Sequence, residues 1–350
     1  MKLKYRPFQQ GDEDALSDLF NEVFGWRPVP SYWDWKYFQN PAGPHDAFVA
    51  ECQGTIVGEI AAVPIRVKIG SEEVIASQTC DIVIAPRYRK GTPFFRLHKM
   101  ASDEVDRRQW EFVYGISVKT TYRISTKVLG FSGVGPIRRM VKILNPVPFL
   151  GQRFRGRILA DSLGAIARNG MRMLEWKRLK PSPTIEIRHV ESFDKSFDEL
   201  WERRARDFEI MVVRNSQYLN WRYCANPVQK YTTLAGFRDN ALAGFVTLCS
   251  RVENGIRRGY ILELLAPPDD DELTRSLLCH AILQFGREHV DIANMWLFEH
   301  MPGFEISRKL GFRPKESPHD LIIRPHGEQE KGYLSDITRW FLTIGDSDYR

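Results

Sequence analysis

An aromatic motif that occurs twice is the feature that most constrains the fold of this chain. Trp35-Lys36-Tyr37 recurs as Trp221-Arg222-Tyr223, 186 positions later. Other residues recur at the same or nearly the same spacing: Asn40 with Asn226, Gly58 with Gly244, and Leu129-Gly130-Phe131 with Leu310-Gly311-Phe312. A tryptophan, a basic residue and a tyrosine in a row form a rare pattern, and its recurrence with other residues at a shared spacing indicates an internal duplication. We therefore expect two similar halves that repeat one fold.

The hydrophobic pattern of the first half predicts both strands and helices. Alternating or continuous apolar runs predict strands at Lys2–Phe8, Ala47–Cys52, Ile56–Ile69, Val74–Ile84 and Phe112–Ile116. Apolar residues at helical spacing predict helices at Gly11–Phe24, Ser31–Asn40, Phe94–Arg107 and Thr120–Leu129. The second half repeats this order, so the predicted fold class is α+β.

The duplication also sets the expected domain boundaries, at 1–145 and 184–325, with a connector at 146–183 and a tail at 326–350. Between Ile137 and Lys180 there are eleven basic and two acidic residues, a net charge of +9, whereas the whole chain carries +6. Residues 153–180 are therefore predicted to form a partly helical basic connector. It either docks on an anionic membrane surface or partner, or bridges the two units with solvated charges.

Composition places the chain among ordinary globular proteins. Its 350 residues are 43% hydrophobic and 27% charged. The amino terminus lacks the apolar core of a signal peptide, and no apolar run is long enough to span a membrane. The five cysteines are scattered without metal or redox spacing, and no His/Cys/Asp cluster has the spacing of metal ligands. We therefore expect a cytoplasmic protein with free thiols and no metal site.

The stretch from Asp81 to Leu97 carries the clearest binding signal. The β-branched run Ile82-Val83-Ile84 predicts a buried strand, and Pro93 suits the first turn of a helix. Between them lies a turn with Arg87, Arg89 and Lys90, which we call the basic turn (Arg87–Thr92). Backbone amides and the helix dipole add positive potential at such a turn, which favours a pyrophosphate. An alternative is a surface turn whose charges are simply solvated.

This strand, turn and helix resemble the acetyl-CoA motif of GNAT-family N-acetyltransferases. Arg89 matches the basic position of that motif, Gly91 stands one place before its glycine position, and Thr92 and Phe94 stand where small residues are usual. Both halves look like GNAT folds, each a mixed, mostly antiparallel sheet flanked by helices. The Trp-Lys/Arg-Tyr-x-x-Asn-Pro element and the tail Trp340–Asp348 resemble those of tandem-GNAT proteins associated with bacterial polysaccharide assembly.

The resemblance implies roles for individual residues of the first half. The cofactor site, for acetyl-CoA as co-substrate, would consist of Ile82, Val83, Ile84, Arg89, Lys90, Gly91 and Thr92. Asp81 would take the proton from the ammonium group of the acceptor. Tyr122 would return a proton to the thiolate, one helical turn before Thr126, which stands at the family's usual tyrosine position. For both residues a purely structural role is the alternative.

The second half carries the opposite charge at the equivalent turn. Asp269-Asp270-Asp271-Glu272 would repel a pyrophosphate, so we expect this half to have lost CoA binding. Its predicted role is to shape the acceptor cleft between the halves. Arg214, Tyr218 and Arg222 are the candidate substrate-binding residues there, with a structural role as the alternative.

Three functions remain open from the sequence. The first is acetyl transfer from acetyl-CoA to a primary amine, with an amino sugar or sugar nucleotide in polysaccharide biosynthesis implied by the resemblance alone. The second is aminoacyl transfer from tRNA, as in Fem-type proteins, which the basic connector would suit. The third is a non-catalytic GNAT-like binding protein. We expect a small-molecule partner and no sequence-specific binding of nucleic acid, and the sequence leaves the oligomeric state open.

Overall fold

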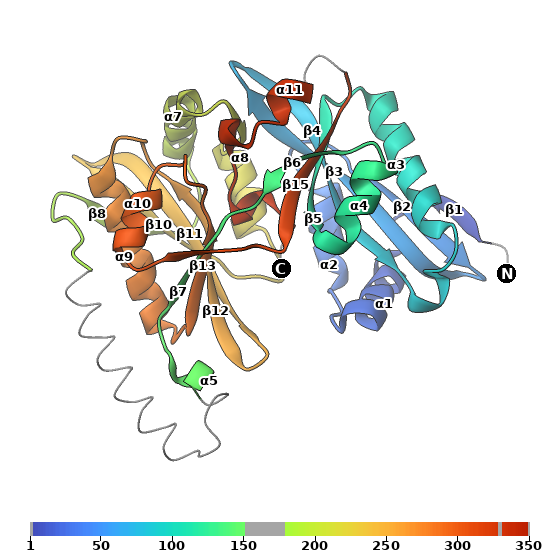
Figure 1. Cartoon of the computed structure of the whole chain (residues 1–350), viewed down its shortest axis with the longest axis horizontal. Coiled ribbons are helices and arrows are strands. Elements are labelled where there is room, and N and C mark those ends of the chain that lie inside the picture. Colours follow the sequence, from blue (N-terminus) through green and yellow to red (C-terminus); the bar gives the residue numbers. More distant parts are fainter. Residues whose placement is uncertain (1–2, 151–178, 328–330, 349–350) are drawn as a thin grey trace.

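Two mixed β-sheets with helices packed on them make up the structure (Figure 1). The structure is a computed structural model, and it describes residues 3–150, 179–327 and 331–348. The predicted connector 153–180 therefore lies almost wholly outside the described residues. The α+β class and the flanking helices agree with the sequence prediction.

The first sheet has the strand order β1-β2-β3-β4-β5-β15-β6, and β9 and β16 extend it beyond β3. Its strands are β1 (Lys4–Pro7), β2 (Asp46–Cys52), β3 (Thr55–Ile69), β4 (Glu72–Ile84), β5 (Phe112–Val118), β6 (Ser132–Pro136), β9 (Ile210–Val212), β15 (His319–Pro325) and β16 (Trp340–Phe341). The pairs are antiparallel except β4 with β5 and β9 with β16.

The second sheet has the order β14-β7-β13-β12-β11-β10-β8. Its strands are β7 (Arg139–Ile143), β8 (Glu186–Val190), β10 (Thr232–Arg238), β11 (Ala241–Glu253), β12 (Ile256–Leu265), β13 (Ile292–Trp296) and β14 (Arg313–Lys315). Only β12 and β13 run parallel, as β4 and β5 do in the first sheet. The two sheets thus repeat one pattern.

Helices cover both sheets and connect their strands. They are α1 (Glu13–Phe24), α2 (Pro30–Trp33), α3 (Pro93–Arg108), α4 (Lys119–Lys127), α5 (Val147–Leu150), α7 (Lys195–Arg204), α8 (Ser216–Leu219), α9 (Asp271–Arg287), α10 (Phe304–Lys309) and α11 (Lys331–Leu334). Short 3₁₀ turns lie at Pro86–Tyr88, Ala205–Asp207, Ile337–Arg339 and Ile344–Asp346. No helix in the described part of the chain is both long enough and apolar enough to cross a membrane.

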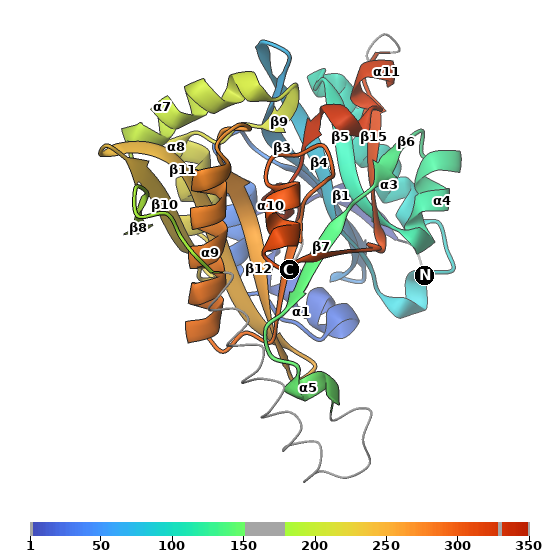
Figure 2. The same cartoon turned by 60° about the vertical axis from the view of Figure 1, so that its left-hand side comes forward.

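The two halves exchange strands, which the sequence did not predict. β15 comes from the second half but lies antiparallel between β5 and β6 of the first sheet. β7 comes from the first half but lies between β13 and β14 of the second sheet, and Figure 2 shows it (green) running alongside the orange strands. Neither predicted unit, 1–145 or 184–325, therefore contains all the strands of its own sheet.

The duplicated aromatic motifs meet at the contact between the halves. Each motif forms a π-helical turn, at Asp34–Phe38 and at Asn220–Cys224. The rings of Trp35 and Trp221 stack with 5.1 Å between their centroids. Trp35 Nε1 donates to Trp221 O at 2.7 Å, and Trp221 Nε1 donates to Trp35 O at 2.9 Å. Equivalent residues thus contact each other reciprocally, and this fixes how the two halves pack.

Candidate functional site

The predicted strand, turn and helix of the first half are present. β4 ends at Ile84, and α3 begins at Pro93. The Arg89 side chain donates from Nε to Ile84 O at 3.1 Å, which holds the basic turn against the end of β4. Arg89 and Lys90 are exposed, so the turn presents positive charge to solvent beside the first turn of α3.

A cavity of about 350 Å³ opens where β4 and β5 part, and we call it the β4–β5 cavity. The two strands are paired only at Ser77 with Val113 and at Gln78 with Tyr114 in the described structure. Beyond these pairs, side chains from β4, α3, β5, α4, the segment after α4, β15 and the C-terminal tail line the opening, among them Asp81, Ile82, Phe94, Ile116, Phe131, His319 and Asp348. Of the predicted cofactor residues, Ile82 lines the cavity, while Val83 and Ile84 are buried.

Asp81 lies at an irregular position of β4. Its φ is +52°, and the pairing of β3 with β4 shifts its register at this point. A bulge of this kind turns a side chain out of the regular alternation of a strand. The Asp81 carboxylate accepts a hydrogen bond from the Tyr37 hydroxyl at 2.9 Å and one from Cys80 Sγ at 3.6 Å. These contacts fix the carboxylate at the wall of the cavity.

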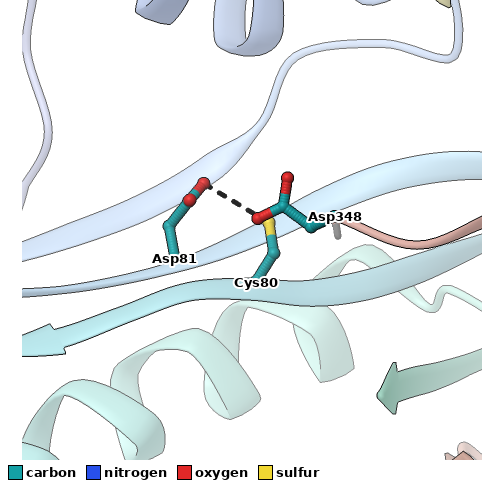
Figure 3. A group of neighbouring side chains, drawn as sticks. All are labelled: Cys80, Asp81 and Asp348. Atoms are coloured by element: carbon teal, nitrogen blue, oxygen red, sulfur yellow. Dashed lines mark hydrogen bonds between the residues drawn. The ribbon is translucent and has the colours of Figure 1, made fainter. Parts of the chain in front are cut away.

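The C-terminal tail adds a second carboxylate, Asp348, beside Asp81 and Cys80 (Figure 3). One ligand atom from each of these three residues lies within 4.8 Å of the others, a spacing that could hold a metal ion. A protein cation already lies there, because Lys36 Nζ is 2.5 Å from Asp81 Oδ2 and 2.7 Å from Asp348 Oδ1. Burial opposes the charge of this ammonium, yet Asp348 and Asp81 raise the pKa of Lys36 well above its ordinary value.

Sequence reasoning missed Asp348 and Glu59 as parts of this arrangement. Glu59 is completely buried and lies 2.7 Å from the Tyr37 hydroxyl, whose single proton is shared between Glu59 and Asp81. Burial raises the pKa of Tyr37 well above its ordinary value, and Asp81 and Glu59 add to the shift, so the hydroxyl stays a donor. The tail had been noted only for its resemblance to other tails. Its return to the first half depends on tertiary packing that spacing does not reveal.

Arg214 does not line the β4–β5 cavity, and its contacts support the structural alternative to a role in binding substrate. Its side chain is completely buried and donates to Glu263 Oε2 at 2.9 Å and to both oxygens of Asp346 at 2.8 and 2.7 Å. Glu263 also accepts from the Tyr223 hydroxyl at 2.7 Å, as Glu59 does from Tyr37. Arg214 thus anchors the tail to the second half.

Tyr218 and Arg222 hold the tail at the contact between the halves. Tyr218 is buried, and the two residues line a gap of only about 20 Å³ together with residues of both halves and of the tail. Arg222 donates to Gly345 O at 3.3 Å and to Ser347 O at 2.7 Å. Arg222 is thus held by carbonyl groups of the tail and Tyr218 is buried beside it, so their positions support the structural alternative.

Tyr122 lies outside the set of residues that line the β4–β5 cavity. Thr121 and Ser125 of α4 line it, whereas Tyr122 packs against the apolar cluster that contains Phe131 and Ile322. Its hydroxyl lies so close to Gly133 that a β-carbon there would be 2.0 Å away. The structure therefore gives no support to Tyr122 as the proton donor to a leaving thiolate.

The acidic turn of the second half caps its own helix. Asp270 accepts from Leu273 N at 3.0 Å and pairs with Arg238 at 2.6 Å, and the Arg238 contact lowers the pKa of the Asp270 carboxyl. The gap between β12 and β13 holds only about 10 Å³ and is filled by apolar side chains such as Leu262 and Met295. This half offers neither an anion site nor room for a ligand arm at the equivalent place.

Comparisons with known proteins agree with the geometry. A sequence model described as an acetyltransferase (GNAT) domain matches residues 4–126. No curated protein sequence matches the chain significantly. Several solved structures share its fold. A probable N-acyltransferase of unknown function from Enterococcus faecalis V583 is 10% identical, with a TM-score of 0.64 over 95% of this chain and 74% of that one.

Two further structures have known ligands or pathways. The N-myristoyltransferase of Saccharomyces cerevisiae with bound myristoyl-CoA is 11% identical, with a TM-score of 0.64 over 93% of this chain and 79% of that one. A tandem GNAT protein from the clavulanic acid biosynthesis pathway is 14% identical, with a TM-score of 0.62 over 93% of this chain and 99% of that one. At these identities the likeness concerns the fold, which is a tandem GNAT fold.

Proposed function

We propose that this chain, with its tandem GNAT acyltransferase fold, transfers an acetyl group from acetyl-CoA to a primary amine. The observation that carries the proposal is the β4–β5 cavity of about 350 Å³ beside the basic turn of the first half. The equivalent gap of the second half holds about 10 Å³ and lies beside an acidic turn. Cofactor binding in the first half alone accounts for this difference.

In this proposal the pyrophosphate lies on the basic turn and the pantetheine arm enters between β4 and β5. Arg89 and Lys90 supply charge. The Gly91 amide already donates to Tyr88 O at 3.3 Å, so Thr92 supplies the backbone amide before α3. Ile82 and Ile116 lie beyond the last pair of β4 with β5 in the described part of the chain, so their backbone groups on the side of the gap can face the arm. The thioester would then lie near Asp81 and Asp348.

The reaction needs one proton acceptor and one proton donor. The free amine attacks the thioester carbonyl carbon, a C–N bond forms and the C–S bond breaks. The proton that the new amide nitrogen loses passes, directly or through water, to the departing thiolate of CoA. The ammonium form of the acceptor must first lose a proton, and Asp81 or its neighbour Asp348 would take it, directly or through water. Asp348 is the more accessible of the two, since 25% of its side chain is exposed against 1% for Asp81.

The acceptor in this proposal is an amino sugar or a sugar nucleotide of polysaccharide biosynthesis. Its only support is the resemblance of the Trp-basic-Tyr element and the tail to those of tandem-GNAT proteins in that setting. That the transferred group is acetyl is likewise a proposal. Comparing the transfer rate from acetyl-CoA with the rates from longer acyl-CoA thioesters tests it.

Titration calorimetry with acetyl-CoA tests where the cofactor binds. We expect one site per chain, weakened about tenfold by Arg89→Ala because an ionic hydrogen bond to phosphate is lost. Asp270→Ala in the acidic turn is the matched control and should leave the affinity unchanged. Two sites per chain, or no binding at all, would refute the proposal.

A further inference from the structure

A second cavity, of about 220 Å³, lies between the two sheets. Alternate residues of three neighbouring strands form its floor: Arg258 and Tyr260 of β12, Asn294 and Trp296 of β13, and Arg139 of β7. Alternate residues of a strand share one face, so the floor is one face of the second sheet. Pro318, His319 and Ile344 close the opposite side. We call this space the inter-sheet cavity.

Positive charge exceeds negative charge around the inter-sheet cavity. Its one acidic lining residue among those described is Glu253, which is 3.1 Å from Arg258 Nε and 2.6 Å from Arg251 Nε. Glu253 also accepts from the Tyr260 hydroxyl at 2.7 Å. The single carboxylate of Glu253 is thus shared by the guanidinium groups of Arg251 and Arg258, and Arg139 adds a third positive charge.

Arg139 supplies the charge that Glu253 does not neutralise. Its Nε is buried and has no hydrogen-bond partner in the described part of the protein. A buried donor without an acceptor is costly, and a ligand that brings an acceptor removes that cost. A guanidinium group also presents its donors as a fork that matches a carboxylate or a phosphate.

His319 connects the two cavities, because it lines both the inter-sheet cavity and the β4–β5 cavity. It is the first residue of the exchanged strand β15. Burial lowers the pKa of His319, and Arg139 lowers it further, so the ring is neutral at pH 7 and leaves the positive charge to the arginines. A molecule that extends past His319 would reach from one cavity to the other.

We propose that the inter-sheet cavity binds an acidic group of the acceptor, a carboxylate or a phosphate, through Arg139 and Arg258. The acceptor's amine then reaches past His319 into the β4–β5 cavity. At about 220 Å³ the cavity is smaller than the roughly 300–1,000 Å³ of sites for drug-sized ligands. It therefore fits an acidic head group better than a whole large molecule. That the bound molecule carries the acceptor amine rests on the proposed function. The anion site itself does not depend on that function.

The experiment measures binding of inorganic phosphate and of acetate, with ionic strength held constant by chloride. Thermal denaturation across a concentration series gives each affinity, because a ligand that binds the folded state raises its stability. We expect at least one anion to stabilise the wild type, and Arg139→Gln to weaken that anion about tenfold or more. The stronger of the two anions identifies the acidic group.

Two control variants separate this site from other sources of anion binding. Arg138→Gln removes the neighbouring charge, which is exposed and lies 3.6 Å from Glu299, and should behave as the wild type. Arg89→Gln tests the basic turn, where phosphate could also bind. The affinity of Arg139→Gln for acetyl-CoA should equal that of the wild type, which shows that the variant is folded. The same measurement on the wild type tests the cofactor proposal independently of the anion site. The inference is overturned if neither anion stabilises the wild type, or if Arg139→Gln keeps the wild-type affinity.

Discussion

Replacing Arg214 by methionine should destabilise the protein strongly, and more at alkaline than at acidic pH. The Arg214 side chain is completely buried, as are those of Glu263 and Asp346. The substitution keeps most of the volume of the side chain but removes a cation that contacts both carboxylates. Both carboxylates also lie within hydrogen-bond distance of the Thr343 hydroxyl, at 3.2 and 3.1 Å, so they face each other once the arginine is gone.

The structure allows the size of the effect to be worked out. Removing one partner of a buried ion pair costs about 3–5 kcal/mol, because the remaining charge stays buried and unpaired. An unfolding entropy of about 2.1 cal/mol/K per residue gives about 0.7 kcal/mol/K for this chain, so the melting temperature should fall by about 4–7 °C. Asp346→Asn leaves the neutral pair of Arg214 and Glu263, and should cost less, about 2 kcal/mol.

The pH dependence follows from Glu263. Burial raises its pKa in the folded wild type, and Arg214 opposes that rise. Without Arg214 the folded pKa rises further above the unfolded value of about 4.3. A carboxyl group with a raised folded pKa binds more protons when folded, so its contribution to stability is present at low pH and is lost as the pH rises through the folded pKa. The loss in Arg214→Met should therefore be larger at pH 8 than at pH 5.

Thermal and urea denaturation at pH 5 and pH 8 measure both effects, with Arg206→Met as the control for an exposed arginine of the same half. Arg214→Lys, which keeps a cation, should recover part of the loss. The reasoning fails if Arg214→Met and Arg206→Met have equal stability, or if the loss is the same at both pH values.

Three further predictions concern the contact between the halves, the β4–β5 cavity and the repeated glycines. Trp221→Phe should cost about 1–3 kcal/mol in urea denaturation, because it leaves the buried carbonyl of Trp35 without its donor. In steady-state kinetics, Asp81→Asn should lower kcat by about 10²–10⁴-fold with unchanged CoA affinity, whereas Tyr122→Phe should keep the wild-type kcat. A larger loss of kcat in Tyr122→Phe than in Asp81→Asn would contradict the placement of these side chains. Gly244→Ala should destabilise by about 1–3 kcal/mol in thermal denaturation, since its new β-carbon would lie 2.4 Å from a backbone carbonyl oxygen. Gly58→Ala should cost less, because its tightest contact, at 2.7 Å, is with the flexible end of the Ile84 side chain and the nearest backbone oxygen is 3.5 Å away.

Local structure could be predicted from the sequence with good accuracy. The predicted strands Ile56–Ile69 and Val74–Ile84 correspond to β3 and β4, and the helix Phe94–Arg107 corresponds to α3. Apolar runs and the position of Pro93 predict the boundaries of these elements to within a few residues. The basic turn and the acidic turn also follow from local sequence, because adjacent charges need no tertiary information.

The exchange of strands and the position of the tail could not be predicted in this way. The apolar pattern of β15 fits a buried strand in either sheet, and nothing in Leu321 or Ile323 says that it pairs with β5 rather than with β13. The same limit applies to Arg214, whose partner Asp346 lies 132 positions away. A constant spacing identifies equivalent residues in the two halves. It does not predict which segments of one half contact which segments of the other.

The exchanged strand β15 has a consequence for how the chain is made. The ribosome completes β5 at Val118, but β15 begins only at His319, about 200 residues later. At about 5–20 residues per second, the edge of β5 waits roughly 10–40 s for its partner. During that time the edge of β5 that later pairs with β15 leaves backbone N–H and C=O groups unpaired, and β15, the strand that pairs with β6 in the described structure, has not yet been made. The first half of the protein in sequence is therefore the last to be finished, and its need for chaperones should be greatest before translation ends.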